Sequence, residues 1–405
     1  MKRADGKPAG GGWVARVLMG ALAWLTLLSP VMLPRPDARA AAGPQENAGL
    51  RAGAIDTHGH LQPSPSCGYD AALEEALEAM QRYGIRQTLI MPAPHPAQVE
   101  GLPGSQCADY KALAPLAARH PGRFAFLGGG ATLNPMIHAV ASGEADLEST
   151  LPSFVTTADE ILRYGAVGFG ELAAEHLSFR PGHPYISAPP HHPLFLLLAD
   201  IAASHDVPID LHMEAVAAED LPLPGGLQSP PNPGTLTENI SALERLLAHN
   251  RDARIVWAHA GWDNTGERTV ALMRRLLRDH PNLYMNIKLR PRNVDNRPTD
   301  AAGRLRAGWL DLLRSFPDRF TLGLDAKYPE DTADSGLFQL TEDFLSQLPP
   351  DLANKVGHQN TVRIYQLGRR AICHAPGTPG ERTLRVDAQA LEGHLGHGDR
   401  LGPCL

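Results

Sequence analysis

From Arg51 onward, the chain alternates between short apolar runs and longer amphipathic stretches. The short runs are rich in Ile, Val, Leu and Phe, which is typical of parallel strands that are buried on both faces. They predict eight strands, at Ala54–Thr57, Gln87–Met91, Phe124–Gly128, Ala166–Gly170, Val207–Leu211, Arg254–Ala258, Leu283–Ile287 and Phe320–Leu324.

Between these runs, apolar residues recur three and four positions apart, which predicts amphipathic helices. The pattern is present in Ala71–Tyr83, Pro193–Ser204, Thr237–Ala248 and Glu267–Asp279. Strands that alternate with helices predict an α/β fold, a (β/α)8 TIM barrel in a single domain. A doubly wound open sheet is the alternative, although no G-x-G-x-x-G motif follows the first strand to indicate a dinucleotide site.

The first 40 residues have the pattern of an export signal. Basic residues precede the apolar run Val17–Leu28, and Ala38-Arg39-Ala40 matches a cleavage site. The run is short for a membrane span of about 20 residues, so we expect cleavage, no stable membrane span and a periplasmic or secreted protein. The predicted divisions are a signal peptide at 1–40, a linker at 41–51, the barrel at 52–372 and a C-terminal extension at 373–405.

Charge and cysteine content narrow the picture further. The formal net charge is −7, and no basic stripe with interleaved aromatic residues indicates a nucleic-acid partner. Four cysteines in an exported chain permit two disulfides, and locality favours Cys67–Cys107 and Cys373–Cys404, with buried free thiols as the alternative. The tail after about Gly377 has no clear periodicity, so we expect an irregular extension tied by Cys373–Cys404, or disorder.

Two histidines end the first predicted strand. Residues i and i+2 of a strand point to the same side, so His58 and His60 can both offer nitrogen atoms to one cation. This H-x-H pattern alone is weak evidence for a metal, because such pairs are also common in cores.

Four more strands each deliver one ligand-type residue at the carboxyl end, where the active sites of barrels lie. These residues are Glu171, His212, His259 and Asp325. A shared divalent ion would satisfy them together, whereas buried groups without partners would cost several kcal/mol. The alternative is a set of unrelated residues, each with its own hydrogen bonds.

Other residues at the predicted mouth of the barrel are candidates for substrate binding. Lys288 and Arg290 follow the seventh strand and could hold an anionic group, or form a solvated basic edge. Trp262 and Tyr328 follow ligand-type residues and could stack on a ring. His176 lies in the loop after Glu171 and could reach a substrate.

In these strand-end motifs the sequence resembles the amidohydrolase superfamily, and most closely its amidohydrolase-related branch, which includes aminocarboxymuconate semialdehyde decarboxylase. The resemblance covers about residues 52–370. It rests on Asp56-Thr57-His58-Gly59-His60, Gly170-Glu171-Leu172, Leu211-His212, His259-Ala260-Gly261, Gly323-Leu324-Asp325 and the closing segment Gly357–Tyr365.

The resemblance implies roles for these residues. His58, His60, His212 and Asp325 would bind a metal, and Asp325 and His259 would move protons as catalytic residues. Many members with two metals have a carboxylated lysine where this chain has Glu171, which would either bridge two metals or orient a ligand histidine. One or two metals are therefore expected, with Zn²⁺ favoured and Mn²⁺ or Fe²⁺ compatible.

The leading functional prediction is a metal-dependent hydrolase of a C–N or C–O bond in an amide, lactone or ester, with metal-activated water as the nucleophile. The alternative is a metal-dependent decarboxylase of an unsaturated or aromatic acid, and the second alternative is a non-catalytic periplasmic binding protein. The absence of a G-x-S-x-G motif disfavours a serine hydrolase. We expect a small-molecule substrate, and the basic residues are compatible with an anionic one. A homo-oligomer is left open.

Overall fold

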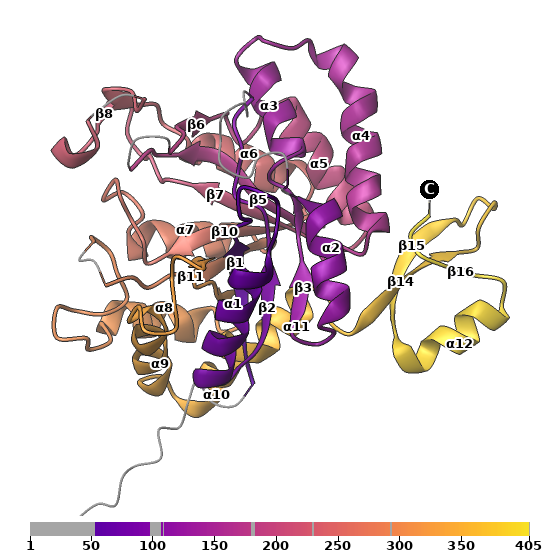
Figure 1. Cartoon of the computed structure of the whole chain (residues 1–405). Coiled ribbons are helices and arrows are strands. Elements are labelled where there is room, and N and C mark those ends of the chain that lie inside the picture. Colours follow the sequence, from indigo (N-terminus) through magenta and orange to yellow (C-terminus); the bar gives the residue numbers. More distant parts are fainter. Residues whose placement is uncertain are drawn as a thin grey trace, which may run out of the picture. The chain divides into compact units, whose positions relative to one another are not determined.

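A central sheet of mostly parallel strands organises the chain in the computed structural model, which describes residues 53–97, 107, 109–179, 183–228, 231–291 and 294–404 (Figure 1). The predicted signal peptide and linker lie outside these residues. The strand order is β3-β2-β1-β12-β11-β10-β7-β5-β4, with β13 paired to β1 and β6 antiparallel to β5. The strands are β1 (Ala54–Leu61), β2 (Ile85–Ile90), β3 (Phe124–Phe126), β4 (Gly128–Gly129), β5 (Phe169–His176), β6 (Ile186–Ser187), β7 (Pro208–Met213), β10 (Arg254–Ala260), β11 (Leu283–Ile287), β12 (Phe320–Leu322) and β13 (Ala326–Tyr328).

The predicted α/β class is confirmed, but the strand path has two ends rather than forming a continuous ring. Its ends, β3 and β4, are separated only by Leu127; β3 pairs with β2 and β4 pairs with β5. Gly129 has a φ of 114°, which a residue with a side chain rarely adopts. The strand predicted at Phe124–Gly128 is divided at Leu127 into β3 and β4.

Helices follow the strands and cover the sheet with their apolar faces. Leu243 and Leu247 of α6 and Leu276 of α7 are fully buried in the same core cluster as strand residues such as Phe169. Burying one such side chain stabilises the fold by roughly 1.5–3 kcal/mol. The helices are α1 (Asp70–Arg82), α2 (Tyr110–Arg119), α3 (Leu133–Ala141), α4 (Leu147–Arg163), α5 (Pro193–Ser204), α6 (Ile240–His249), α7 (Val270–Asp279), α8 (Ala307–Ser315), α9 (Leu337–Ser346), α10 (Pro350–Asn354) and α11 (Asn360–Ile364).

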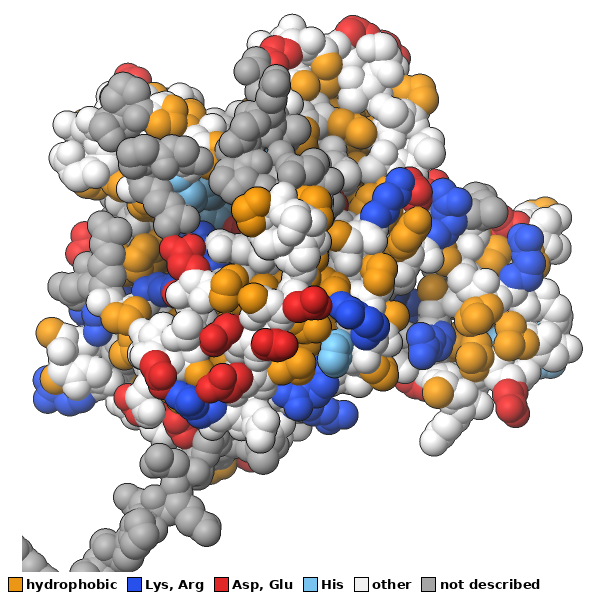
Figure 2. All heavy atoms as spheres, in the orientation of Figure 1, with side chains coloured by type: hydrophobic (Ala, Val, Ile, Leu, Met, Phe, Trp, Pro, Cys, Tyr) orange, Lys and Arg blue, Asp and Glu red, His pale blue; other side chains and the backbone are white. Residues whose placement is uncertain are grey.

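The segments that connect the main strands and helices contain further short elements. The surface has both acidic and basic side chains. A hairpin of β8 (Leu221–Pro222) and β9 (Thr235–Leu236) lies in the long segment after β7, and a π-helix (Lys355–Gln359) joins α10 to α11. On the face shown in Figure 2, acidic and basic side chains are interspersed, so this face has no continuous basic stripe. No helix within the described ranges is long and apolar enough to cross a membrane.

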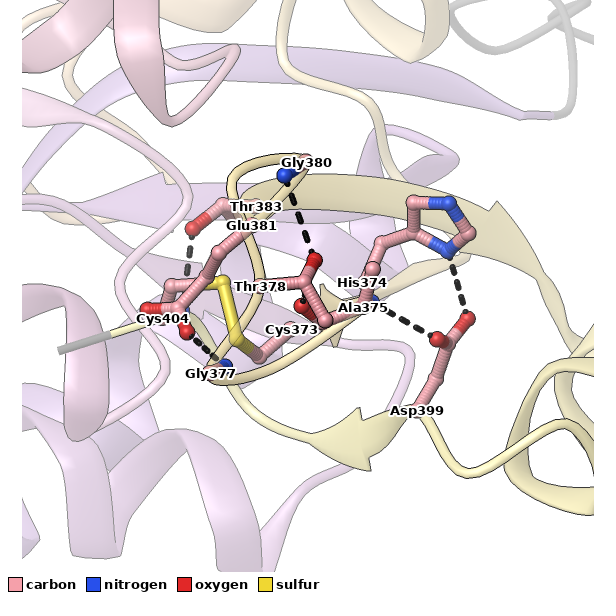
Figure 3. The surroundings of a disulfide bond; sticks show 10 residues. All are labelled: Cys373, His374, Ala375, Gly377, Thr378, Gly380, Glu381, Thr383, Asp399 and Cys404. Atoms are coloured by element: carbon pink, nitrogen blue, oxygen red, sulfur yellow. Dashed lines mark hydrogen bonds and ion pairs between the residues drawn. A yellow bond between two sulfur atoms is a disulfide. The ribbon is translucent and has the colours of Figure 1, made fainter.

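The C-terminal tail is ordered into regular elements, so the expectation of an irregular or disordered extension was wrong. Strands β14 (Arg369–His374), β15 (Arg382–Asp387) and β16 (Arg400–Leu401) form an antiparallel sheet in the order β15-β14-β16, with α12 (Ala388–Gly396) after β15. Two disulfides are present, Cys67–Cys107 and Cys373–Cys404, which are the pairs that locality favoured. Figure 3 shows the second of them.

Candidate metal centre

Four strands and the segment between β12 and β13 bring the predicted ligand residues together. His58 and His60 lie on β1, Glu171 on β5, His212 on β7 and His259 on β10, and Asp325 directly precedes β13. All six side chains are buried. Strands of one parallel sheet end at a common edge, which explains why residues far apart in sequence meet here.

Glu171 lies at the centre of the cluster, and each of its carboxylate oxygens faces a different pair of histidines. Its Oε1 is 2.7 Å from Nδ1 of His212 and 3.0 Å from Nε2 of His259. Its Oε2 is 3.4 Å from Nε2 of His58 and 3.4 Å from Nε2 of His60. The contacts to Oε1 are hydrogen bonds, whereas those to Oε2 are longer and leave that oxygen available to a ligand.

The two histidines of β1 are oriented by partners outside the cluster. His58 has Nδ1 3.2 Å from Oδ1 of Asp210, and His60 has Nδ1 3.0 Å from the carbonyl oxygen of Met91. This leaves both Nε2 atoms facing Glu171, and Nε2 of His58 is buried without a hydrogen-bond partner among the described residues. Histidines that bind metals are typically held in this way, with one ring nitrogen on a carboxylate or carbonyl and the other on the ion.

These donors fit a divalent metal. Two groups, His58–His60–Glu171 and Glu171–His212–His259, each offer three ligand atoms that lie within 4.8 Å of one another. Imidazole nitrogens with carboxylate oxygens suit zinc, manganese and iron alike, so the donor set does not select one of them. Glu171, which was predicted to bridge two metals or to orient a ligand histidine, belongs to both groups and connects them.

A buried ion pair flanks the cluster. Asp325 has Oδ1 3.1 Å from Nε2 of His60, and its Oδ2 accepts a hydrogen bond from the ammonium group of Lys288. The same ammonium lies 5.0 Å from the ring centre of Trp262. Arg290 donates to the backbone carbonyl of Asp325 and forms an ion pair of 2.8 Å with Asp331.

The charges of the side chains in the cluster explain their pKa shifts. Burial alone would raise the pKa of Asp325, but the positive charges of Lys288 and Lys327 outweigh it, and the pKa lies well below its usual value. Burial likewise opposes ionisation of Glu171, whereas the surrounding histidines, His58 foremost, lower its pKa well below the usual range. Burial and the charge of Lys288 lower the pKa of His259, so its imidazole is neutral.

The predicted substrate residues occupy different settings. The His176 ring lies 4.7 Å from the ring of His212, with Nδ1 3.1 Å from the carbonyl oxygen of Pro184. Lys288, Arg290 and Trp262 lie beside Asp325 as described above. Tyr328 departs from the expectation, because its ring is fully buried in the core beside Phe338 rather than exposed to a ligand.

Sequence reasoning missed three residues that hold the ligands in place. Asp210 accepts from Asn286 at 3.0 Å, and the amide oxygen of Asn286 accepts from the backbone N–H of His259 at 2.7 Å. Asp56 accepts from the backbone N–H groups of His58 and Leu324, and burial raises its pKa to about 7. The available signal was spacing: Asp210 and Asp56 each lie two positions before a ligand histidine on the same side of a strand.

Comparison with known proteins identifies relatives by family and by structure. A family model described as amidohydrolase matches residues 55–367. Similar solved structures include a dihydroxybenzoic acid decarboxylase from Polaromonas sp. JS666 with bound manganese (16% identity, 78% of this chain and 98% of that chain, TM-score 0.45). A second is a 5-carboxyvanillate decarboxylase from Novosphingobium aromaticivorans complexed with manganese (13% identity, 79% of this chain and 97% of that chain, TM-score 0.47). A third is a 2,6-dihydroxybenzoate decarboxylase from Rhizobium (14% identity, 78% of this chain and 99% of that chain, TM-score 0.45). No curated protein matches.

These findings correct the leading functional prediction. Hydrolysis of a C–N or C–O bond was expected first, and decarboxylation was the alternative. Several of the similar structures are named as decarboxylases, the activity that the alternative prediction gives.

Proposed function

The chain belongs to the amidohydrolase family, and we propose that this enzyme is a metal-dependent decarboxylase of an aromatic or unsaturated carboxylic acid. The observation that carries the proposal is the buried ion pair of Lys288 and Asp325 beside the histidine cluster. Activation of water for hydrolysis needs a carboxylate or imidazole that readily takes up a proton. Asp325 is held by an ammonium group and is a poor proton acceptor in this arrangement.

The same ion pair supplies the recognition chemistry for the substrate. Lys288 is a buried cation at the edge of the metal cluster, and a carboxylate is the group that such a cation binds. Trp262 lies next to the Lys288 ammonium, so an aromatic face accompanies the charge. Together they favour a flat, unsaturated substrate with a carboxylate over a neutral amide or ester.

His58, His60 and Oε2 of Glu171, with Asp325 beside them, are the groups that would hold the divalent ion. When bound, such an ion polarises a coordinated substrate oxygen and stabilises negative charge. Zinc suits the imidazole-rich donors, and manganese, which two of the similar structures contain, is equally compatible. We expect one ion in the barrel, because His212 and His259 already satisfy Oε1 of Glu171 through hydrogen bonds.

The reaction requires one proton for each molecule of CO2 released. The C–C bond to the carboxylate breaks, its electron pair stays on the substrate carbon, and a proton adds there. The neutral His259 can take up this proton from the surroundings of the cluster and pass it to the carbon, because its Nε2 is fixed by Glu171 while Nδ1 is buried without a hydrogen-bond partner in the described part of the chain and can accept a proton. Lys288 orients the departing carboxylate, and burial of the cluster excludes water.

The proposal is tested by offering metal-loaded enzyme a panel of hydroxylated aromatic acids, with 2,6-dihydroxybenzoate and 5-carboxyvanillate as the first members, and measuring released CO2. Matched esters and lactones are offered in parallel. We expect CO2 release that is lost in Asp325→Asn and falls at least about 100-fold in kcat/KM in Lys288→Met, since a buried charge-assisted contact contributes about 3 kcal/mol. Hydrolysis of the esters without CO2 release from any acid would refute the proposal.

We also propose that the sheet closes as a (β/α)8 barrel through the segment 124–129. Val167 donates to the carbonyl oxygen of Phe126 at 2.9 Å, and Leu127 donates to that of Ile90 at 3.0 Å, so the segment bonds to both neighbouring strands. Hydrogen-exchange protection of these two amides comparable to that of β10 would support closure, and rapid exchange would contradict it.

Export from the cytoplasm is a further part of the proposal. Two disulfides are typical of proteins that fold in an oxidising compartment, and they accompany the predicted signal at residues 1–40. The mature N-terminus of the protein, read by mass spectrometry from a bacterial periplasm, should lie after Ala40. A full-length chain retained in the cytoplasm would contradict export.

A further inference from the structure

Residues 369–404 form a small C-terminal module with little core of its own. Its buried apolar side chains among the described residues are Ile372, Cys373 and Val386, and α12 buries no side chain at all. Units of this size usually need a disulfide or a metal in addition to hydrophobic packing. The Cys373–Cys404 disulfide joins β14 to the end of the chain and does not reach α12.

A cluster of three polar side chains does connect α12 to the rest of the module. Oδ2 of Asp399 is 2.9 Å from Nδ1 of His374, at the end of β14, and 2.8 Å from Nδ1 of His394, on α12. Oδ1 of the same carboxylate accepts from the backbone N–H of Ala375 at 2.9 Å, which fixes its orientation (Figure 3). The Asp399 side chain is 3% exposed, whereas both imidazoles are partly exposed.

The spacing of these donors is close to that of a metal site. The three ligand atoms lie within 4.8 Å of one another. In a tetrahedral zinc site with bonds of about 2.0–2.1 Å, neighbouring ligand atoms are about 3.3 Å apart. The His–Asp separations of 2.9 and 2.8 Å therefore need to widen by only about 0.5 Å, which partly exposed imidazoles can do by small rotations.

We propose that His374, His394 and Asp399 form a second metal site, separate from the barrel, that binds zinc or a similar late first-row divalent ion. Two imidazoles and one carboxylate supply three ligands, and the exposed side of the cluster gives a water molecule access to the fourth position. The carboxylate orientation set by Ala375 is the kind of support that preformed metal ligands have. The inference does not depend on the reaction in the barrel.

The proposed role is structural. An ion at this site would connect β14, α12 and the turn before β16 at one point, and so hold the helix that hydrophobic packing leaves free. Because such an ion binds only the folded module, it suppresses local opening in proportion to its concentration above the dissociation constant.

Metal content of the full-length protein tests the proposal. Wild type, a His374→Ala/His394→Ala double variant and a His249→Ala control are equilibrated with Zn²⁺, dialysed and analysed by plasma mass spectrometry. His249 pairs with Asp200 at 3.0 Å on the surface and is in none of the three-donor groups of the described residues, so it controls for loss of a histidine. We expect one zinc fewer per chain in the double variant alone. Equal zinc content in all three proteins would overturn the proposal. The two histidines would then serve only as hydrogen-bond partners of Asp399.

A second measurement applies if the C-terminal module of the double alanine variant does not fold. His394→Gln keeps a hydrogen-bond donor for Asp399 and removes the imidazole ligand. Trypsin cleavage after Arg382 and Arg400 reports opening of the module, and zinc at about ten times its dissociation constant should slow it about tenfold. We expect this protection in wild type and in His58→Ala, whose altered site is in the barrel, but not in His394→Gln. Zinc that protects none of them, or protects His394→Gln equally, would overturn the proposal.

Discussion

Replacing Asp210 by Asn tests whether the residues behind the histidine cluster determine its affinity for metal. Asp210 uses one oxygen for Nδ1 of His58, at 3.2 Å, and the other for the side-chain amide of Asn286, at 3.0 Å. An asparagine has the same shape but only one acceptor oxygen. It must therefore turn its amide nitrogen toward one of these two neighbours and lose that favourable contact.

The expected loss of metal affinity in Asp210→Asn can be estimated from the distance between Asp210 and His58. Two full charges 3.2 Å apart interact by about 5 kcal/mol at an effective dielectric constant of about 20. A metal-bound imidazole bears only a fraction of a positive charge, so the loss should be about 1.4–2.7 kcal/mol, or about 10- to 100-fold in metal affinity. The fold should persist, because the substitution changes no volume in the core.

Competition with a metal-sensitive dye measures this affinity, in a His374→Ala/His394→Ala background that removes the second proposed site. Asp200→Asn is a closely matched control, because Asp200 also lies between a histidine and an asparagine, His249 at 3.0 Å and Asn250 at 2.9 Å, but on the surface. We expect weaker binding in Asp210→Asn alone. Unchanged affinity in a folded Asp210→Asn protein would refute the reasoning that His58 binds the ion with support from Asp210.

Three further predictions concern stability and are checked by urea unfolding. Burial lowers the pKa of His95 and His138 to about 4, below the unfolded value of about 6.5, so their neutral forms favour the fold. Their contribution to the free energy of unfolding, taken as the difference between wild type and a His95→Gln/His138→Gln variant, should be constant above about pH 6.5 and fall toward pH 4, and a difference that does not change with pH would contradict this. Removing the Cys67–Cys107 disulfide, which spans 40 residues, by a double Ala substitution should cost up to about 4 kcal/mol, and no loss would show that the unfolded chain is not constrained by it. Phe169→Ala, at a fully buried position of β5, should cost about 3–5 kcal/mol, and a cost below about 1 kcal/mol would contradict the packing described.

Most of the central sheet could be predicted because buried positions require apolar residues, and these give a recognisable pattern in the sequence. β11 and α5 have the predicted bounds, since a strand buried on both faces must be apolar throughout and a helix against it must be apolar on one side. The C-terminal module was missed for the converse reason. α12 buries no side chain and β15 buries only Val386, so neither has a hydrophobic period to detect.

The sequence could predict which residues lie at the site, because this depends on their position in the strands. It could not predict which of them contact one another, because this depends on the geometry of residues far apart in sequence. His58, His60, His212 and His259 stand at strand ends, and topology is enough to bring them together. Sequence gives no sign that Glu171 would contact all four, because those contacts depend on side-chain geometry across the sheet.

Glu171 is therefore the residue whose replacement separates a metal ligand from a purely orienting group. In Glu171→Gln, the amide oxygen can still accept from His212 and His259, the shorter contacts at 2.7 and 3.0 Å. The amide nitrogen then takes the place of Oε2, opposite His58 and His60, where it can bind no cation.

If Oε2 of Glu171 is a ligand, Glu171→Gln should lower metal affinity by more than the roughly 10- to 100-fold expected for a residue that only supports a ligand. The same dye competition measures it, with Asp210→Asn as the internal reference for a supporting residue. A loss no larger than that of Asp210→Asn would show that Glu171 only orients His212 and His259. In that outcome the ion would be held by His58, His60 and Asp325 instead, and Asp325→Asn should then cause the larger loss, because Asp325 lies 3.1 Å from His60 and is the remaining carboxylate in contact with that ring.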